Sequence, residues 1–319
     1  TARDTVFQIN YHGYLASERY ANRIPVMSAR EFVNLGGTDI GNNFDWLEEI
    51  TQSAASTASN LSVSGGGKHL NYYASLHYRN VTGILNRSGF ETYGARVNLN
   101  FKALKDRLEL GLLLGGSQQD IKYSFNEAFR YANTFNPTES ANFVNTGSFG
   151  FDMFNPIGVI EQNVNEGTLE SYSGTASGSL KIAEGLKISS LYSGQLIKSF
   201  LGRFFPSDAE FRGANRDGEA QTGDTELQNF RWLSSLNYER KFGTVTASVS
   251  GGYDFQQLMH EGTFIVADDF SSDDEGYHNL SLAENIEESH TKNTHDLSAY
   301  FGEISINYDD YAFLKGTFR

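Results

Sequence analysis

The sequence contains no cysteine, so neither a disulfide framework nor a cysteine-based zinc site can form. No run of about 18 apolar residues occurs, which excludes a transmembrane helix. The sequence has only 25 Lys and Arg residues but 39 Asp and Glu residues. The resulting formal net charge of −14 argues against a nucleic-acid partner, which would need a basic surface. Only four prolines occur, and each lies outside the segments that alternate as strands: Pro25, Pro137, Pro156 and Pro206.

Alternation of apolar and polar residues is the strongest positive signal. Between 92 and 102 the apolar positions are Tyr93, Ala95, Val97, Leu99 and Phe101, and the polar positions between them include Arg96, Asn98 and Asn100. After a turn at Ala103–Arg107, every second residue from Leu108 to Leu114 is again leucine. This period of two predicts strands with two unlike faces. In a soluble sandwich the apolar face would meet a second sheet, whereas in a membrane barrel it would meet lipid.

The connections between the predicted strands alternate in length. Short turns are expected at Gly65–Lys68, Ala103–Arg107, Ala183–Gly185 and Gly243, and long connections at 118–168, 197–226 and 256–294. Outer-membrane barrels combine tight turns at one end with long loops at the other, whereas a sandwich has no reason to do so. We therefore expect about eleven strands of a transmembrane β-barrel, with all short turns at one end and the long connections at the extracellular end.

Shared parity across the hairpins predicts which side chains face lipid and which face the lumen. The expected lipid-facing residues are Val97, Leu99, Leu110, Leu112, Trp232 and Leu236, and the expected lumen-facing residues are Arg96, Asn98, Asn100, Arg231 and Asn237. Trp232 is interpreted as a membrane-interface anchor and Trp46 as part of a loop core. Two short helices are predicted before the second strand: one over about 29–35, with a capping box that starts at Ser28, and one that Asn43 caps.

Several short motifs follow one another in a fixed order along nearly the whole chain. They are Asp45-Trp46, Asn60-Leu-Ser-Val-Ser-Gly-Gly66, Tyr73-Ala-Ser-Leu76, Gly83-Ile84, Tyr93-Gly-Ala-Arg-Val-Asn-Leu99, Asn155-Pro156, Gly178-Ser-Leu180, Glu184-Gly-Leu-Lys187, Tyr308-Asp-Asp-Tyr311 and Phe313-Leu-Lys-Gly-Thr-Phe-Arg319. This series resembles the early barrel of the SusC/RagA-type TonB-dependent outer-membrane transporters of Bacteroidetes.

The resemblance implies a fold, a location and a function. The fold would be all-β, an antiparallel transmembrane barrel, and residues 1–319 would form the N-terminal half of a barrel of about 22 strands, with the plug and the remaining strands outside this chain. The function would be TonB-dependent import of an oligosaccharide or peptide across the outer membrane. A SusD-like surface lipoprotein and, through segments absent here, the TonB complex would be the partners, and no cofactor is implied. Two alternatives stay open: a structural or adhesive outer-membrane barrel without transport, and a soluble glycan-binding β-protein.

No catalytic motif is found, so we expect that the protein is not an enzyme. Gly65-Gly-Gly-Lys68 lacks the Ser or Thr and the helix that a phosphate-binding loop needs, and predicts a hairpin turn instead. Five acidic residues are weak candidates for Ca²⁺ ligands: Asp268, Asp269, Asp273, Asp274 and Glu275. Their spacing does not match an EF-hand, and a solvated acidic loop is the favoured interpretation, so no metal site is predicted.

The segment 118–168, which is rich in Phe and Asn, motivates a binding hypothesis. Aromatic faces and amide groups together suit sugar rings or peptide backbones. The candidate contacts with substrate or lipoprotein are Phe129, Tyr131 and Phe149, with Asn155 as a polar partner. The competing and favoured interpretation is that these aromatic residues pack the segment against itself, the plug or the lipoprotein.

Overall fold

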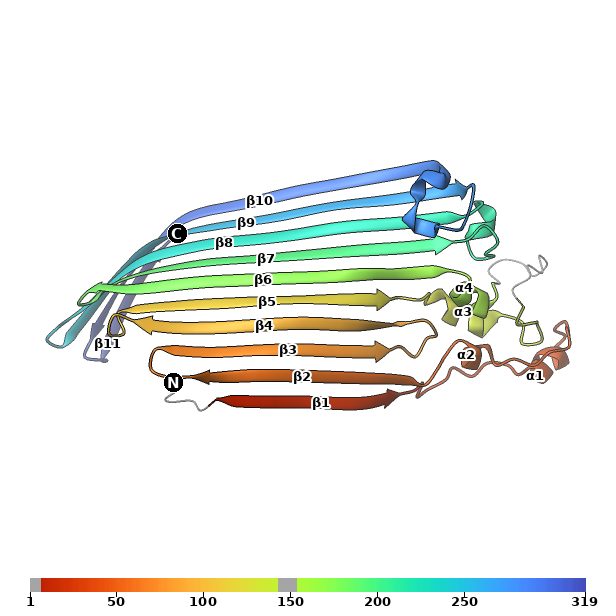
Figure 1. The fold of residues 1–319 in the computed structure, drawn as a ribbon, viewed down its shortest axis with the longest axis horizontal. Helices are drawn as coiled ribbons and strands as arrows, with labels where there is room; N and C mark the ends of the chain where they lie inside the picture. Colours follow the sequence, from red (N-terminus) through yellow and green to blue (C-terminus); the bar gives the residue numbers. More distant parts are fainter. Residues whose placement is uncertain (1–6, 143–153) are drawn as a thin grey trace.

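A single antiparallel sheet runs through the computed structural model, which describes residues 7–142 and 154–319 (Figure 1). Its eleven strands pair in chain order, each with the next. The strands are β1 (Gln8–Glu18), β2 (Ala54–Gly66), β3 (Leu70–Thr82), β4 (Gly89–Ala103), β5 (Leu108–Lys122), β6 (Val164–Ala183), β7 (Leu186–Phe205), β8 (Glu219–Phe242), β9 (Val245–Phe270), β10 (Ala283–Tyr308) and β11 (Ala312–Phe318). The predicted all-β antiparallel fold and the predicted number of strands are confirmed.

Short helices lie only in the connections. They are α1 (Ala29–Asn34) and α2 (Trp46–Glu49) before β2, α3 (Glu127–Thr134) and α4 (Pro156–Glu161) between β5 and β6, and the 3₁₀ turns η1 (Gly213–Asn215), η2 (Gly276–His278) and η3 (Leu280–Leu282). The capping box at Ser28 is present, because its side chain and that of Glu31 each bond the other's backbone N–H. The expected cap at Asn43 is wrong: Asp45 caps α2 by accepting from the Glu48 amide, since a cap must directly precede the first turn.

All short turns lie at one end of the sheet and the helices lie at the other (Figure 1). This follows from the strand order, because antiparallel neighbours in chain order place every second connection at the same end. Backbone conformation fits the turns: both residues of the Asp309-Asp310 turn have positive φ, at 50° and 56°, as a type I′ turn requires. The prediction that the short turns share one end is therefore confirmed.

The strand register joins the predicted apolar positions into one face. Leu99 pairs with Leu112, and the same row continues through Ala176 and Tyr192 to Trp232. The row one residue along the strands joins Asn98 to Arg231 through Leu113, Thr175 and Ser193. Directly paired residues point to the same side of a sheet. The two sets of residues that the sequence separates thus lie on opposite faces, with Leu113 as an apolar exception on the polar face.

The strands extend further toward the helical end than the alternation predicts. The long connection expected at 256–294 is mostly strand, since β9 runs to Phe270 and β10 begins at Ala283. The connection expected at 197–226 shortens in the same way, because β7 runs to Phe205 and β8 begins at Glu219. In the parts of these strands near the helical end, polar residues lie on both faces of the sheet. The alternation of apolar and polar residues therefore disappears there, although the backbone hydrogen bonds between the strands continue. The predicted loop boundaries there are wrong for this reason.

Candidate functional site

Three connections come together at the helical end and bury a shared core, here called the loop cluster. Its buried residues are Trp46, Leu47, Ile50, Leu85, Phe125, Ala128, Tyr131, Ala132, Val159, Ile160 and Phe205. They come from α2, the β3–β4 connection, the β5–β6 connection with α3 and α4, and the upper end of β7. Burial of apolar area holds these segments together and forms a rigid group at one end of the sheet.

Trp46 lies at the centre of the loop cluster. Its side chain is 2% exposed, stacks on Phe44 with ring centroids 4.7 Å apart, and meets Phe135 edge-on at 5.2 Å. Its indole Nε1 donates a 3.0 Å hydrogen bond to the backbone oxygen of Asn136. The tryptophan therefore ties the β1–β2 connection to the β5–β6 connection, which confirms the interpretation of Trp46 as part of a loop core.

Three of the four proposed contact residues lie in or beside this cluster. Tyr131 is buried and meets Phe154 edge-on at 5.4 Å, while Phe129 is half-buried and stacks on Tyr20 with centroids 6.4 Å apart. Asn155 is buried: its Oδ1 accepts from the Ile157 and Gly158 amides at the start of α4. Phe149 lies outside the described residues. Of the three, Phe129 is half-buried, whereas Tyr131 and Asn155 are buried.

Polar residues that the sequence did not single out fix the connections to one another. Thr138 is buried, and its hydroxyl bonds both the Asn136 side chain and the backbone oxygen of Thr38. Glu219, whose side chain is fully buried, is paired with Arg212 at 2.6 Å and with Arg216 at 3.1 Å. No local sequence pattern predicts the roles of Thr138 and Glu219. Their partners are either distant in sequence or located in irregular loops.

The five weak metal candidates do not form a common site. Asp268 accepts from Arg216 and from Asn285, and Asp273 accepts from the amide and hydroxyl of Ser207 at 2.8 and 2.7 Å. Across 7–142 and 154–319, no three acidic or histidine side chains come together as a metal site. Asp268 and Asp269 lie within β9, which ends at Phe270, so the run is divided between a strand end and a short connection.

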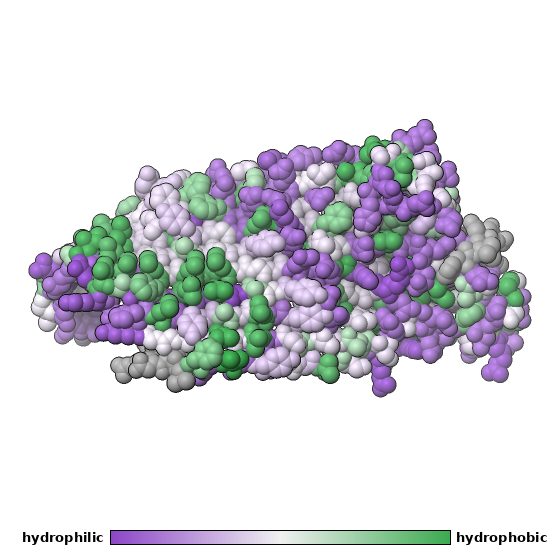
Figure 2. Space-filling model, in the orientation of Figure 1, coloured by the Kyte–Doolittle hydropathy of each residue, from purple (hydrophilic) through white to green (hydrophobic). Residues whose placement is uncertain are grey.

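The apolar face forms a band that ends in tyrosines. On β4 the band runs from Ala103 to Tyr93, and the next residue on this face is Glu91, whose Oε1 accepts from the Tyr78 hydroxyl at 2.5 Å. On β6 Tyr172 donates in the same way to Glu170 at 3.2 Å. Figure 2 shows one face of the molecule, on which hydrophobic residues gather toward the short turns and hydrophilic residues toward the helical end.

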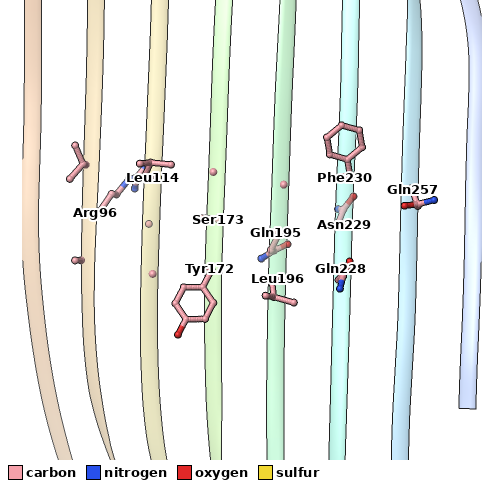
Figure 3. Close-up of a pocket in the computed structure, with 16 residues that line it drawn as sticks. Arg96, Leu114, Tyr172, Ser173, Gln195, Leu196, Gln228, Asn229, Phe230 and Gln257 are labelled. Carbon is pink, nitrogen blue, oxygen red and sulfur yellow. The ribbon is translucent and has the colours of Figure 1, made fainter. Parts of the chain in front are cut away.

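A shallow hollow interrupts the upper part of this apolar band (Figure 3). Gly116, Gly174 and Gly194 line it on three neighbouring strands, together with Tyr172 and Phe230. Its residues belong mainly to the apolar face, so the hollow opens on the side opposite to Arg231 and Asn98. It is therefore separate from the polar face and from the loop cluster.

The polar face carries a fixed ion pair. Arg231 donates from Nε and Nη2 to the two oxygens of Asp254, at 3.0 and 3.1 Å, and Gln256 and Arg319 also donate to that carboxylate. Asp254 is 3% exposed, while the Arg231 side chain keeps 42% of its surface accessible. A bidentate pair of this kind holds a guanidinium in one orientation on the sheet surface.

In the described parts of the chain no helix has both the length and the apolar character needed to cross a membrane.

No family model matches the chain. The chain is 25% identical over 281 residues to the TonB-dependent receptor P3 of Formosa agariphila. The aligned region covers 83% of this chain and 28% of that protein. It is 32% identical over 113 residues to the TonB-dependent receptor SusC of Bacteroides thetaiotaomicron, covering 33% of this chain and 11% of that one.

Solved structures show the same fold. The structure of the RagAB peptide transporter matches 99% of this chain and 42% of the compared chain, with a TM-score of 0.79 and 12% sequence identity. The chain thus spans less than half of this structure and 28% of the P3 receptor. Both curated relatives are named as TonB-dependent receptors, in agreement with the prediction that the protein is not an enzyme. The chain is similar over most of its length to a TonB-dependent receptor, and its sheet has the fold of part of the RagAB transporter chain.

Proposed function

We propose that this chain is the N-terminal half of an outer-membrane barrel of about 22 strands that imports an oligosaccharide or a peptide with energy from TonB. The observation that carries the proposal is the two-faced sheet of eleven strands, with short turns at one end and the long connections at the other, in a chain similar to TonB-dependent receptors. The RagAB match is to a peptide transporter and the SusC match is to a TonB-dependent receptor, so both substrate classes stay within the proposal.

The height of the apolar band supports a membrane location. From Ala103 to Tyr93, steps of about 3.3 Å along a strand tilted by about 40° rise roughly 25 Å, the height of the apolar band of outer-membrane barrels. Tyrosines at its upper edge match an aromatic girdle, and the carboxylates beyond them would lie in water. In this proposal Leu112 and its row face lipid, Arg231 and Asn98 face the lumen, and the helical end is extracellular.

The loop cluster is the proposed site of contact with substrate or with a SusD-like lipoprotein. It is packed around a buried core, lies at the proposed extracellular mouth, and presents half-buried aromatic surface at Phe129. Tyr131 and Asn155 would act from beneath, because their burial fixes α3 and α4 and thereby the position of Phe129. Phe149 remains a proposed contact from the sequence.

Uptake by the native organism tests the function. Deleting the full-length gene should abolish uptake of one labelled oligosaccharide or peptide, and deleting TonB should abolish the same uptake. If both deletions leave uptake of every tested oligosaccharide and peptide unchanged while surface adhesion is lost, the adhesive alternative replaces import. Release of the protein from cells without detergent would instead support the soluble glycan-binding alternative.

One substitution tests the site. Phe129→Ala in the full-length receptor should lower uptake or retention of the lipoprotein, because it removes aromatic surface at the mouth. Phe242→Ala is the matched control, since Phe242 is an exposed aromatic residue at the end with the short turns. Equal uptake and equal retention of the lipoprotein in both variants would remove Phe129 from the proposed contact.

A further inference from the structure

The two faces of the sheet differ in charge as well as in hydropathy. Across β2–β7 the polar face carries one acidic side chain, Glu109, against six basic ones: Arg79, Arg96, Lys102, Lys181, Lys187 and Arg203. The apolar face of the same strands carries two basic side chains, Lys122 and Lys198, against four acidic ones: Glu91, Asp120, Glu166 and Glu170. The chain as a whole has a formal net charge of −14, so the polar face of these strands is basic in an acidic protein.

Two of these arginines and a histidine are neighbours on the polar face of β3 and β4. Arg79 and His77 lie two residues apart on β3 and therefore point to the same side of the sheet. His77 pairs with Gly94 on β4, and its imidazole lies over that glycine, where a Cβ atom would collide with the ring. Arg96 follows Gly94 by two residues on the same face. Arg79, His77 and Arg96 thus form one group, here called the basic patch.

No carboxylate of the described chain neutralises the basic patch. Within 7–142 and 154–319 neither the Arg79 nor the Arg96 guanidinium forms a salt bridge or a hydrogen bond, and Arg79 lies over the Phe90 ring with its Cζ 5.1 Å from the centroid. Glu109, the acid of this face, lies at the end with the short turns and is paired with Lys102 at 3.2 Å. Both arginines of the patch are exposed, so their N–H donors are accessible to a ligand.

The surroundings of the patch favour an acidic sugar chain over a peptide. Guanidinium groups bind carboxylates through two parallel hydrogen bonds. Arg96 pairs with Ser75 and with Gly115, and Asn98 follows it on the same face, so hydroxyl and amide groups that suit sugar hydroxyls lie beside open backbone.

An extended peptide is recognised through a free strand edge or an apolar groove. Neither β3 nor β4 has a free edge, because each is paired with a strand on both sides. The length of the patch favours an oligomer over a single small anion. Arg79 pairs with Thr92, four residues from Arg96, which corresponds to about 13 Å along the strand.

We propose that the basic patch binds an acidic oligosaccharide, one whose sugar rings carry carboxylates, on the face that lines the lumen of the proposed barrel. Arg79 and Arg96 bind carboxylates on different sugar units, and His77 bonds a hydroxyl between them. This inference rests on the proposed import and narrows its substrate class. The positive charge of the wall attracts the acidic sugar chain, and the hydroxyl and amide groups around it bind the remaining sugar hydroxyls.

Calorimetric binding to the purified full-length receptor in detergent tests the patch. The probes are hexamers of galacturonate and of mannuronate, with maltohexaose as the neutral sugar and hexaglutamate as the acidic peptide. At least one acidic sugar should bind, and Arg79→Gln and Arg96→Gln should each weaken its binding by about tenfold or more, because a charge-assisted hydrogen bond is lost. Arg96→Lys should weaken it less than Arg96→Gln, since the charge is kept.

Lys122→Gln is the matched control. It removes the same charge from an exposed side chain on the opposite face, on the neighbouring strand β5, and should leave binding unchanged. Equal urea midpoints of all variants and the wild type show that the barrel is folded in each.

Three results would overturn the proposal. The first is that neither acidic sugar binds the wild-type receptor. The second is an acidic sugar that binds with equal affinity to the wild type, Arg79→Gln and Arg96→Gln. The third is binding of hexaglutamate that depends on both arginines without binding of either acidic sugar, which would assign the patch to an acidic peptide.

Failure of the inference and failure of the proposed import give different results. Loss of uptake of a neutral sugar or a peptide on gene deletion, without binding of either acidic sugar, would retain import and reject the inference. Binding of an acidic sugar that depends on the arginines, with all uptake unchanged on gene deletion, would retain the patch and reject import.

Discussion

The apolar band and the loop cluster contain large apolar side chains in opposite situations. Leu112 and Leu114 on β5 are 36% and 48% exposed, whereas Trp46 and Ile50 in the loop cluster are 2% and 0% exposed. The loop cluster builds its own core from four segments, with hydrogen bonds to its buried polar groups. In the described residues the leucines of the band stay exposed, and in the proposed barrel lipid would surround them. The comparison teaches that the loop cluster is stabilised by its own core, whereas the band of the proposed barrel would be stabilised by the membrane.

The largest expected effect is on the loop cluster. Trp46→Ala removes a buried indole and leaves a cavity, which should lower the free energy of local unfolding of the cluster by about 3–5 kcal/mol. Hydrogen exchange of amides in α2 and α3 measures it, with the amides of β4 as the control. Because the sheet is held by its own ladder, β4 should be unaffected. Equal loss of protection in β4 would show that the cluster and the sheet unfold as one unit.

The next largest effect is expected from placing a positive charge on the apolar face of β5, compared with the same charge on its polar face. Leu112→Arg on the apolar face should cost about 2–4 kcal/mol of stability in lipid bilayers, because the guanidinium would lie in hydrocarbon. Leu113→Arg is the matched control, since this neighbour lies on the polar face in the row of Asn98 and Thr175. Urea unfolding of the full-length barrel in vesicles measures both. A larger loss in Leu113→Arg than in Leu112→Arg would reverse the assignment of lipid and lumen.

A smaller effect is expected for the cap of α4. Asn155→Ala removes the acceptor for the Ile157 and Gly158 amides and the bond to Ser140, and should destabilise α4 by about 1 kcal/mol. Exchange rates of these two amides measure the loss. Asn155→Asp should restore most of it, because aspartate caps equally well. An unchanged exchange rate in Asn155→Ala would show that packing alone holds α4.

The smallest expected effect depends on pH. Hydrogen bonds from the Ser28 backbone and side chain lower the pKa of Glu31 below its ordinary value. A lowered pKa in the folded state stabilises the capping box above the unfolded pKa, and this stabilisation is lost as pH falls through the folded pKa. Amide exchange in α1, corrected for intrinsic rates, should therefore rise in acid. Glu31→Gln should remove this pH dependence, and its persistence in the variant would assign it to another group.

Alternation identified the strands only where their two faces meet different surroundings. Val97 and Arg96 could be assigned to opposite faces because an apolar band lies on one side only. The upper part of β9, from Glu261 to Phe270, carries apolar and polar residues on both faces, so the alternation is lost there. The ladder with β8 and β10 nevertheless continues there, because backbone hydrogen bonds do not depend on which side chains the strand carries.

The sequence by itself determined the antiparallel fold, the two faces, the end that holds the short turns, the capping box at Ser28 and the resemblance to TonB-dependent receptors. These properties depend on residues that are neighbours in the chain or repeat every second position. Only the tertiary structure decided that Trp46 contacts Asn136 and that Asn155 is buried rather than on the surface. Such contacts join segments far apart in sequence, and no local pattern of residues encodes which of them meet.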